Sequence, residues 1–417
     1  MMTYRPRLVD GMLSSLLKTI GAVLIEGPKL CGKSTTAMEQ SKSVLFMESG
    51  QTLQIAAINP KLLLEGEVPR LIDEWQLAPQ IWDAIRREVD FRGGKSGQFI
   101  LTGSAVPADR SGIMHSGTGR FGWLRMRTMT LFETNESNGG VSLASLFAKK
   151  LDIGCVNSLS IEDIAFIACR GGWPTTLQQT GDMALKHAFT YFDAIVREDI
   201  CRVDGVKRKE DYARQLLRSY ARAQGSQISA PEIAKDMGNG INDKTVLSYI
   251  HALRQLFVIE DLPAWSPNLR SKTAIRTSDT RYFVDPSIAV AALGAGPRDL
   301  LQDPQTFEFV FETLCVRDLR VYAETLDGSL YHFRDKSGLE CDAVLHRRNG
   351  TYGLIEIKLG SAKGIEDGAK TLKELANKIN TNVMPPPSFM MILTATGDYA
   401  YRRDDGVLVV PIGCLRP

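Results

Sequence analysis

One eight-residue segment constrains this chain more than any other, because it fits only a strand, a tight loop and a helix in that order. The segment is Gly27-Pro28-Lys29-Leu30-Cys31-Gly32-Lys33-Ser34, and it follows the apolar run 22–25. Its two glycines let the backbone curl until successive N–H groups point at a bound phosphate. A helix that starts there, running on through Thr35, adds the positive end of its dipole. Residues 27–35 are therefore predicted to bind ATP.

Two side chains of this segment carry the chemistry. Lys33 is predicted to supply a positive charge for the β and γ phosphate oxygens, and Ser34 a hydroxyl ligand for Mg²⁺.

A second element fits the first. Residues 70–74 read as a short buried strand that ends in two adjacent carboxylates, Asp73 and Glu74. We expect Asp73 to hold Mg²⁺ and Glu74 to orient or deprotonate the attacking water. The alternative is an ordinary strand end followed by a helix cap.

A third strand is predicted at 99–102, and it ends in a hydroxyl. Thr102 would lie between the two earlier strand ends and sense the γ-phosphate. Hydrolysis also needs a cation on the developing charge, and Arg120 is the predicted arginine finger, with Arg125 and Arg127 as rivals. A solvated surface arginine is the competing interpretation for Arg120.

Composition sets limits on partners and compartment. A chain of 417 residues exceeds one typical core, so two or three domains are expected. The net charge is only +2, so any contact with nucleic acid must come from a local patch. Seven cysteines without metal-type spacing favour a reducing cytoplasm, and no apolar run approaches the ~20 residues needed to cross a bilayer.

The pattern of apolar residues divides the chain into four predicted regions. Strand-like runs that alternate with helical periodicity indicate a parallel sheet covered on both faces, with the nucleotide at the carboxyl ends of its strands. The expected fold is thus an α/β P-loop NTPase core at 1–140, a helical lid at 141–205, a winged-helix-like domain at 206–290 and a small α/β domain at 291–417. Arg170, in the lid, is a candidate second sensor of nucleotide.

The winged-helix prediction rests on three helices and a pair of strands. Ser229 and Asp243 are expected to cap the second and third helices, with a turn at 238–240 between them. The segments 258–262 and 281–284 would pair as the wing. Such a module either binds DNA or serves as a scaffold for protein packing, and the few positive charges on its third helix leave both interpretations open.

The carboxy-terminal region carries a second possible chemistry. Two strands, 339–345 and 352–359, flank the turn 348–350 and form a predicted hairpin. Its side chains suit metal-dependent phosphodiester cleavage: Asp342 and Glu356 would hold Mg²⁺, and Lys358 would position the attacking water or stabilise the developing charge. Glu312, from a preceding helix, would reach the same metal. The alternative is a hairpin with a solvated salt bridge on its polar face.

With these motifs in view, the chain resembles a group of prokaryotic AAA-type ATPases that join an ATPase core to a C-terminal domain of unknown function. The resemblance implies a helical lid, a winged-helix region and a C-terminal unit similar to the PD-(D/E)xK restriction-endonuclease fold. Relatives usually carry a branched aliphatic residue where Cys341 stands, and the proline that precedes the first acidic residue of the motif is absent here. The matching segments are Gly27–Ser34, 71–74, 101–104, 115–120, 171–174, 282–285, 311–312, 337–342 and 355–358.

Together these features predict a cytoplasmic, Mg²⁺-dependent ATPase whose nucleotide state acts through winged-helix and nuclease-like modules, on or around DNA. Two alternatives stay open: a nucleotide-gated switch that binds DNA or protein and has an inactive nuclease-like domain, and an ATP-licensed DNA nuclease in defence. If Arg120 acts on a neighbouring subunit, the protein must assemble as a homo-oligomer. No membrane partner is expected.

Overall fold

The structure is a computed structural model that describes residues 4–103, 116–238, 240–268, 277–382 and 384–417. Three positions within the ranges given above, Ser104, His115 and Asn239, lie outside the described residues. The described chain divides into two compact units, the first drawn from residues 1–128, 194–210 and 248–258, the second from 129–193, 211–247 and 259–417. The chain changes unit within three helices, α7 (Asp182–Ala194), α9 (Glu210–Arg222) and α11 (Asp243–Gln255).

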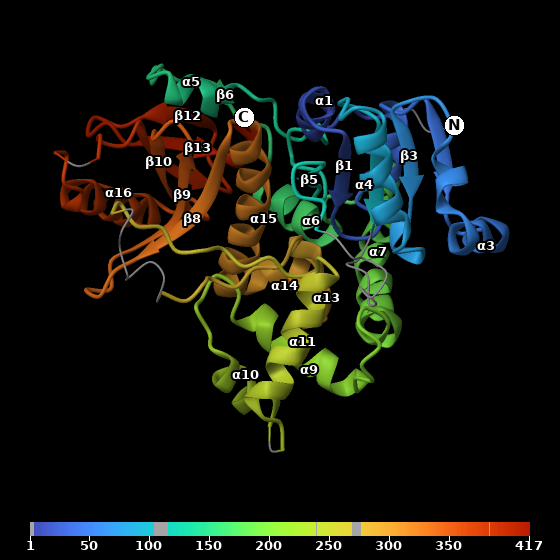
Figure 1. Ribbon diagram of the computed structural model, residues 1–417. Coiled ribbons are helices and arrows are strands. Elements are labelled where there is room, and N and C mark those ends of the chain that lie inside the picture. Colours follow the sequence, from blue (N-terminus) through green and yellow to red (C-terminus); the bar gives the residue numbers. More distant parts are fainter. Residues whose placement is uncertain (1–3, 104–115, 239, 269–276, 383) are drawn as a thin grey trace. The chain divides into compact units, whose positions relative to one another are not determined.

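A five-stranded sheet organises the first unit, and Figure 1 draws it in blue to cyan. All its pairings are parallel, in the order β2-β3-β4-β1-β5. The carboxyl ends of the strands therefore meet at one edge, as the sequence predicts. The strands are β1 (Ala22–Glu26), β2 (Ser43–Phe46), β3 (Arg70–Asp73), β4 (Phe99–Gly103) and β5 (Phe121–Arg125).

Helices cover both faces of this sheet, which confirms the predicted architecture. Alternate residues of β1 enter opposite cores: Ala22 and Leu24 join one apolar cluster, Val23 and Ile25 the other. The first cluster contains the apolar stripe of α4, and the second contains that of α1. The helical elements are α1 (Val9–Thr19), α2 (Lys33–Glu39), α3 (Gly50–Ile58), α4 (Ile81–Phe91) and α8 (Ile200–Arg202), the 3₁₀ helices η1 (Pro60–Leu64) and η2 (Trp75–Leu77), and the π-helix η4 (Ile195–Asp199).

The second unit is built on a mixed seven-stranded sheet in the order β7-β12-β13-β11-β10-β9-β8, with a separate pair β14-β6. Its strands are β6 (Val141–Ser142), β7 (Cys155–Val156), β8 (Gly328–Arg334), β9 (Glu340–Arg347), β10 (Tyr352–Lys358), β11 (Phe389–Thr394), β12 (Tyr399–Arg402), β13 (Leu408–Pro411) and β14 (Leu415–Arg416). Its helical elements are α5 (Leu143–Phe147), α6 (Ile161–Arg170), α10 (Ala230–Met237), α13 (Pro286–Leu293), α14 (Pro297–Gln302), α15 (Pro304–Thr325), α16 (Ala362–Lys378), η3 (Pro174–Gln178) and η5 (Ile412–Cys414).

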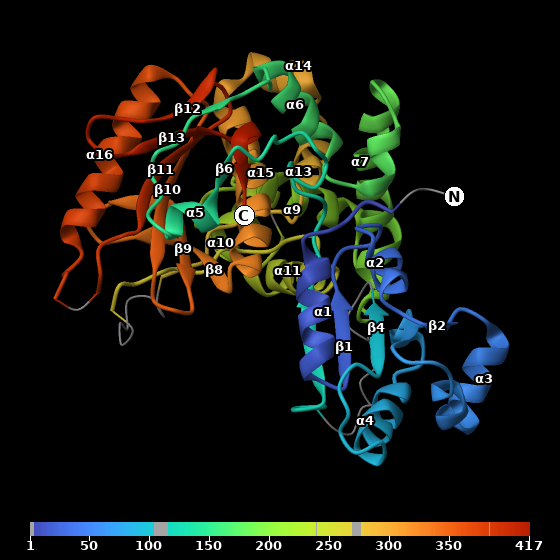
Figure 2. The same cartoon turned by 90° about the horizontal axis from the view of Figure 1, so that it is seen from above.

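Two long helices, α15 and α16, lie on opposite faces of this sheet in both views (Figures 1 and 2). The predicted carboxy-terminal hairpin is confirmed, because β9 and β10 pair antiparallel with Ala343 opposite Ile355. An irregularity lies in β9: Tyr331 and Phe333 of β8 face Val344 and Cys341, so two steps on β8 match three on β9. Two residues of β9, Asp342 and Ala343, therefore lie opposite a single residue of β8.

The middle region follows the predicted pattern with one correction. Ser229 caps α10, as expected, by accepting a hydrogen bond from the backbone of Glu232. The third helix is capped differently, because the side chain of Asn242, and not Asp243, accepts from the amide of Thr245. The predicted wing segments do pair, with antiparallel bridges of Ile259 to Phe283 and Leu262 to Thr280.

The segment predicted as a lid is divided between strands and helices. Its short strands β6 and β7 pair with β14 and β12, close to the C-terminus, and α6 packs against α13, α14 and α15. Sequence reasoning had no means of seeing these partners, since each lies more than 100 residues away. The movement of a lid over the nucleotide stays a prediction.

A buried polar network joins several of the motifs in this unit. The guanidinium of Arg317 is within 3.3 Å of Asp285 and 2.7 Å of Asp318, and all three side chains are almost fully buried. Asp285 also accepts from the amide of Gly172, and Asp318 accepts from the amide of Leu131. Burial raises the pKa of Asp318 to about 6, although the charge of Arg317 opposes that shift. One arginine thus stabilises two carboxylates that have no access to water.

Replacing Arg317 tests this dependence. Arg317→Ala leaves Asp285 and Asp318 buried without their cation, so we expect the free energy of unfolding to fall by about 3–5 kcal/mol. Urea denaturation measures the change. The matched control is Arg348→Ala, whose ion pair with Asp327 is exposed on both sides and should contribute less than about 0.5 kcal/mol. Equal losses in the two variants would contradict the role of the network.

Candidate functional site

The phosphate loop connects β1 to α2 in the first unit, as predicted. Its backbone requires glycine at the start, because a Cβ at Gly27, whose φ is +157°, would lie 1.9 Å from the carbonyl oxygen of Met126. Leu30 and Gly32 also have positive φ, at 63° and 102°. The loop therefore curls tightly before the helix begins at Lys33.

Two cations, Lys33 and Arg7, donate hydrogen bonds to backbone carbonyl oxygens of this loop. The ammonium of Lys33 is buried and donates to the carbonyl oxygens of Gly27 and Pro28 at 2.9 and 2.7 Å. Arg7 donates to the carbonyl oxygens of Cys31 and Arg127, each at 2.9 Å. Sequence reasoning missed Arg7, since a single arginine 24 residues before Cys31 gives no local signal.

Two strand ends and a helix start meet at one carboxylate. The hydroxyl of Ser34 donates to Oδ1 of Asp73 at 2.7 Å, and the hydroxyl of Thr102 donates to the same oxygen. Asp73 and Thr102 are direct neighbours in the register of β3 and β4. Of the three oxygen-bearing side chains that sequence reasoning selected for the metal and the γ-phosphate, both hydroxyls therefore lie within hydrogen-bonding distance of the carboxylate. Hard oxygen ligands of this kind are what Mg²⁺ prefers.

Glu74 follows at the turn out of β3. Its φ of 56° puts it in the left-handed region, which is uncommon for a residue with a side chain and is enriched at functional sites. Its carboxylate accepts a hydrogen bond from the side chain of Gln76. The side chain is half-buried, and so retains access to solvent water.

The predicted arginine finger, Arg120, lies near the amino ends of the strands, whereas the phosphate loop lies at their carboxyl ends. The carbonyl of Arg120 accepts from Ala22, at the start of β1, whereas the phosphate loop begins after Glu26, at its end. Five strand residues separate the two points by roughly 15 Å. The exposed guanidinium of Arg120 instead pairs with Asp90 at 2.9 Å. Within one chain Arg120 therefore does not reach the loop, and only action on a second subunit stays a prediction.

The two rival arginines lie closer to the loop edge. Arg125 ends β5 beside Glu26, with 3.6 Å between its guanidinium and that carboxylate, and stacks over the ring of Phe257. Arg127 is buried. Sequence position alone did not separate these three arginines, because only the strand register shows which of them lie near the carboxyl ends of the strands.

A second cluster of charges lies in the second unit, where the sequence placed the nuclease-type residues. The ammonium of Lys358 is 3.3 Å from Asp342 and 3.1 Å from Glu356, so it bridges the two carboxylates. Asp342 also accepts from the amide of Ile357 at 2.7 Å. Glu312, on α15, is hydrogen-bonded to the hydroxyl of Tyr282.

Electrostatics couple these groups. Burial, followed by the negative charge of Asp342, raises the pKa of Glu312 well above its usual value and that of Glu356 to about 8. Burial alone would lower the pKa of Lys358, but Asp342 and Glu356 raise it instead. Several acids with perturbed pKa values beside one lysine are typical of functional sites, although structural ion pairs produce the same effect.

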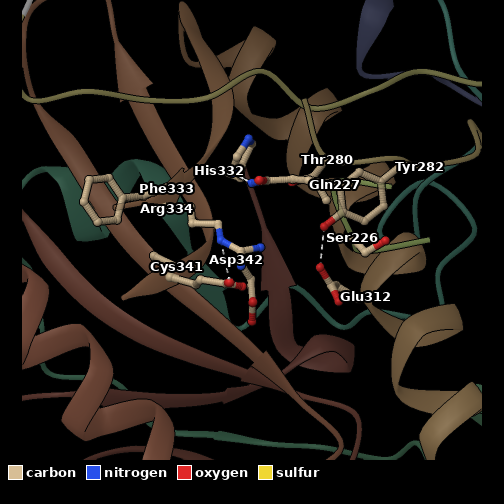
Figure 3. A pocket seen from close by; sticks show the side chains of 12 residues that line it. Ser226, Gln227, Thr280, Tyr282, Glu312, His332, Phe333, Arg334, Cys341 and Asp342 are labelled. Carbon is tan, nitrogen blue, oxygen red and sulfur yellow. Dashed lines mark hydrogen bonds and ion pairs between the residues drawn. The ribbon is translucent and has the colours of Figure 1, made fainter. Parts of the chain in front are cut away.

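A polar pocket opens beside this cluster (Figure 3). Glu312 and Asp342 contribute to its wall, and Figure 3 shows Tyr282 directed at Glu312. Among the residues that the structure describes, no group of three or more His, Cys, Asp or Glu side chains is arranged to hold a metal ion. The metal roles of Glu312, Asp342 and Glu356 stay predictions.

Arg170, the candidate second sensor, is engaged elsewhere. Its buried guanidinium forms a bidentate ion pair with Glu136, at 2.6 and 2.9 Å. Trp173, which follows it, donates from its ring nitrogen to Ser287 at 3.0 Å. Both contacts belong to the packing of the second unit, and a nucleotide-sensing role for Arg170 stays a prediction.

The pocket wall also contains a buried histidine, His332. Its Nε2 lies 3.1 Å from the carbonyl oxygen of Ser278, and its Nδ1 lies 3.4 Å from the amide nitrogen of Gln227. A neutral ring that donates from Nε2 and accepts at Nδ1 satisfies both partners. Burial accordingly lowers the pKa of His332 to about 4.

This shift predicts a pH dependence of stability. Between pH 6.5 and 4 the unfolded histidine binds a proton that the folded one does not, so the free energy of unfolding should fall as pH falls through this window. The loss is on the order of 3 kcal/mol. Denaturation at several pH values should show a smaller slope for His332→Gln than for the wild type, whereas His251→Gln, at an exposed position, should keep the wild-type slope. Identical slopes in the two variants would refute the assignment.

Within the described residues, no helix is both long and apolar enough to cross a membrane. A search of curated proteins found no match. Solved structures that resemble the chain include the Walker-type ATPase paby2304 of Pyrococcus abyssi (12% identity, 68% of this chain, 94% of that one, TM-score 0.41) and RuvB of Thermotoga maritima (20%, 61%, 89%, 0.28). A DNA replication initiation factor also matches (14%, 59%, 85%, 0.25). These TM-scores are below 0.5, and nothing about this chain is inferred from them.

Three family models match successive parts of the chain. Residues 161–299 match a domain of unknown function, DUF8612, and residues 307–415 match another, DUF4143. Residues 20–135 match an AAA domain. The predicted combination of an AAA-type core with a C-terminal domain of unknown function is thereby confirmed, while its nuclease-like character is not. The parallel sheet and the phosphate loop agree with the third match, since the described residues within 20–135 have a P-loop α/β fold.

Proposed function

We propose that this protein binds and hydrolyses ATP with Mg²⁺ in its AAA domain. The observation that carries the proposal is the single carboxylate, Asp73, that accepts hydrogen bonds from both Ser34 and Thr102 beside the phosphate loop. The packing of an ordinary strand end does not require two hydroxyls and an acid from three separate elements to meet. A site for Mg²⁺ and nucleotide does require such a group of oxygen atoms.

Each residue then has a defined task. Backbone amides of residues 27–35 would cradle the phosphates, and Lys33 would turn its ammonium toward their oxygens. Ser34 and Asp73 would hold Mg²⁺, which when bound offsets phosphate charge. Glu74 would orient or deprotonate the attacking water, and Thr102 would contact the γ-phosphate.

Turnover of this kind needs a further cation, and Arg120 lies too far from the loop of its own chain to supply it. If Arg120 acts, it acts on a neighbouring subunit, so the active form would be a homo-oligomer. Arg125 is the rival within one chain, because it ends its strand at the loop edge of the sheet.

We further propose that the nucleotide state acts through the winged-helix-like and carboxy-terminal regions, on or around DNA. The three helices α9, α10 and α11, followed by the paired segments at Ile259 and Phe283, support a winged-helix arrangement. The inward stripe of α11 is buried as that fold requires, at Val246, Ile250 and Leu253. Whether its outer face binds DNA or protein distinguishes the proposal from its rivals.

Glu74→Ala tests the catalytic assignment. The variant should keep ATP bound, because the phosphate loop is intact, while phosphate release falls by about 10²–10⁴-fold. Equilibrium binding and a phosphate-release assay measure the two effects. Glu65→Ala, at an exposed acid on the same unit, is the control and should leave both unchanged. Normal phosphate release by the Glu74 variant would show that Glu74 is not the catalyst.

A second candidate function is cleavage of DNA licensed by ATP. One observation favours it: Lys358 bridges Asp342 and Glu356 in a mostly buried cluster, where a surface hairpin would leave these groups solvated. In this proposal Asp342 and Glu356 hold the metal, Lys358 positions the water, and Glu312 joins them from α15.

Asp342→Asn distinguishes this function from an inactive domain. If the cluster cleaves DNA, nicking of plasmid DNA with Mn²⁺ and ATP should disappear in this variant while ATP turnover is kept. Glu340→Gln, two residues away and paired with Arg334 on the exposed side, should nick DNA normally. Absence of nicking by the wild type, together with nucleotide-dependent binding of DNA or protein, would select the switch without a nuclease.

A further inference from the structure

The phosphate loop contains a second lysine, and its side chain is held by a distant acid. The ammonium of Lys29 is 2.5 Å from Oδ1 of Asp199. Both residues belong to the first unit, although 170 positions separate them in the sequence. The side chain of Lys29 is 44% exposed and that of Asp199 only 12%. Asp199 is therefore the more buried partner, and the side chain of Lys29 has more open space in which to move.

Asp199 lies at the end of an unusual helical segment. It closes the π-helix η4, which connects α7 to α8. Insertions of this kind are rare, shift the side chains that follow, and occur often at functional sites. The two charged residues before Asp199 are exposed and pair elsewhere, Arg197 with Glu210 and Glu198 with Arg202. Of three consecutive charges, only Asp199 is directed at the phosphate loop.

Lys29 starts from the part of the loop that would surround the phosphates. It follows directly on Gly27 and Pro28, whose carbonyl oxygens receive the ammonium of Lys33. A four-carbon stem lets a lysine ammonium sweep several ångströms without moving its backbone. A triphosphate offers this ammonium more negative charge than one carboxylate does.

We propose that Lys29 is a second phosphate-binding cation and that Asp199 competes with the phosphates for its ammonium. Triphosphate draws the ammonium of Lys29 from Asp199 to its own oxygens, and the π-helix loses its contact with the loop. This proposal rests on the ATP-binding function above and adds to it a sensor of the bound nucleotide. Residues 195–202, which belong to the first unit between two stretches of the second, then report whether the loop is occupied.

Equilibrium binding of a non-hydrolysable ATP analogue with Mg²⁺ provides the first test. Asp199→Asn removes the competing charge and should tighten binding about five- to tenfold, whereas Lys29→Met should weaken it about tenfold. Lys29→Arg, which keeps the charge, should restore most of the affinity. Glu198→Gln is the matched control, because this neighbouring acid is exposed and does not touch the loop, so its affinity should equal that of the wild type.

Hydrogen exchange gives a readout that a merely structural ion pair would not change. In the wild type, the analogue should speed exchange at the amides of residues 195–202, since their link to the loop is released. In Asp199→Asn and Lys29→Met, exchange there should be fast already and should not respond to the analogue.

The outcomes separate this inference from the function on which it rests. If the wild type binds no nucleotide, ATP binding itself is refuted and the inference falls with it. If the wild type binds but Asp199→Asn does not bind more tightly, or exchange at 195–202 does not respond, the inference alone is overturned. Comparison of Asp199→Asn with Lys29→Met keeps the test decisive if either variant folds poorly.

Discussion

The first unit depends on one carboxylate at the carboxyl edge of its sheet. Asp73 accepts hydrogen bonds from Ser34 of α2 and Thr102 of β4, so it ties the phosphate loop, the central strand and its neighbour together. This arrangement is available only because all five strands are parallel, which brings their carboxyl ends to the same edge. Near that point, Glu74 has a left-handed backbone conformation, and the backbone at Gly27 lies too close to Met126 to admit a Cβ.

The second unit also depends on a polar interaction, but this interaction is a buried network of ion pairs. Its segments come from widely separated parts of the sequence, and Arg317 joins them by pairing with Asp285 and Asp318 where all three side chains are buried. Each of these acids also holds a backbone amide of a remote segment. Buried charges cost much free energy unless each is paired and hydrogen-bonded, so such a network specifies one arrangement of the segments. The motifs around Gly172 and Asp285 are thus explained by packing.

Most of the structure that could be predicted follows from patterns of residues close together in the sequence. The phosphate loop, the strands ending at Asp73 and Thr102, and the hairpin that carries Asp342 and Glu356 each depend on residues close in sequence, and each lies where expected. The sequence did not reveal ion-pair partners that are distant along the chain: Arg120 pairs with Asp90 and Arg170 with Glu136, while the finger and sensor roles of these arginines stay predictions. A local correction is the helix cap, where Asn242 takes the place assigned to Asp243. Sequence spacing says nothing about which edge or which partner a charged side chain finds.

The sequence by itself therefore determined the P-loop α/β core, the positions of Ser34, Asp73, Glu74 and Thr102 at its helix start and strand ends, and the presence of an acidic hairpin near the C-terminus. The reason is that glycine conformations, strand alternation and helix starts are set by neighbouring residues. Only the tertiary structure decided that Lys29 meets Asp199, that Lys358 bridges two acids, and that β6 and β7 pair with strands near the C-terminus. Those contacts arise when burial brings remote segments together, and charge then selects the partner.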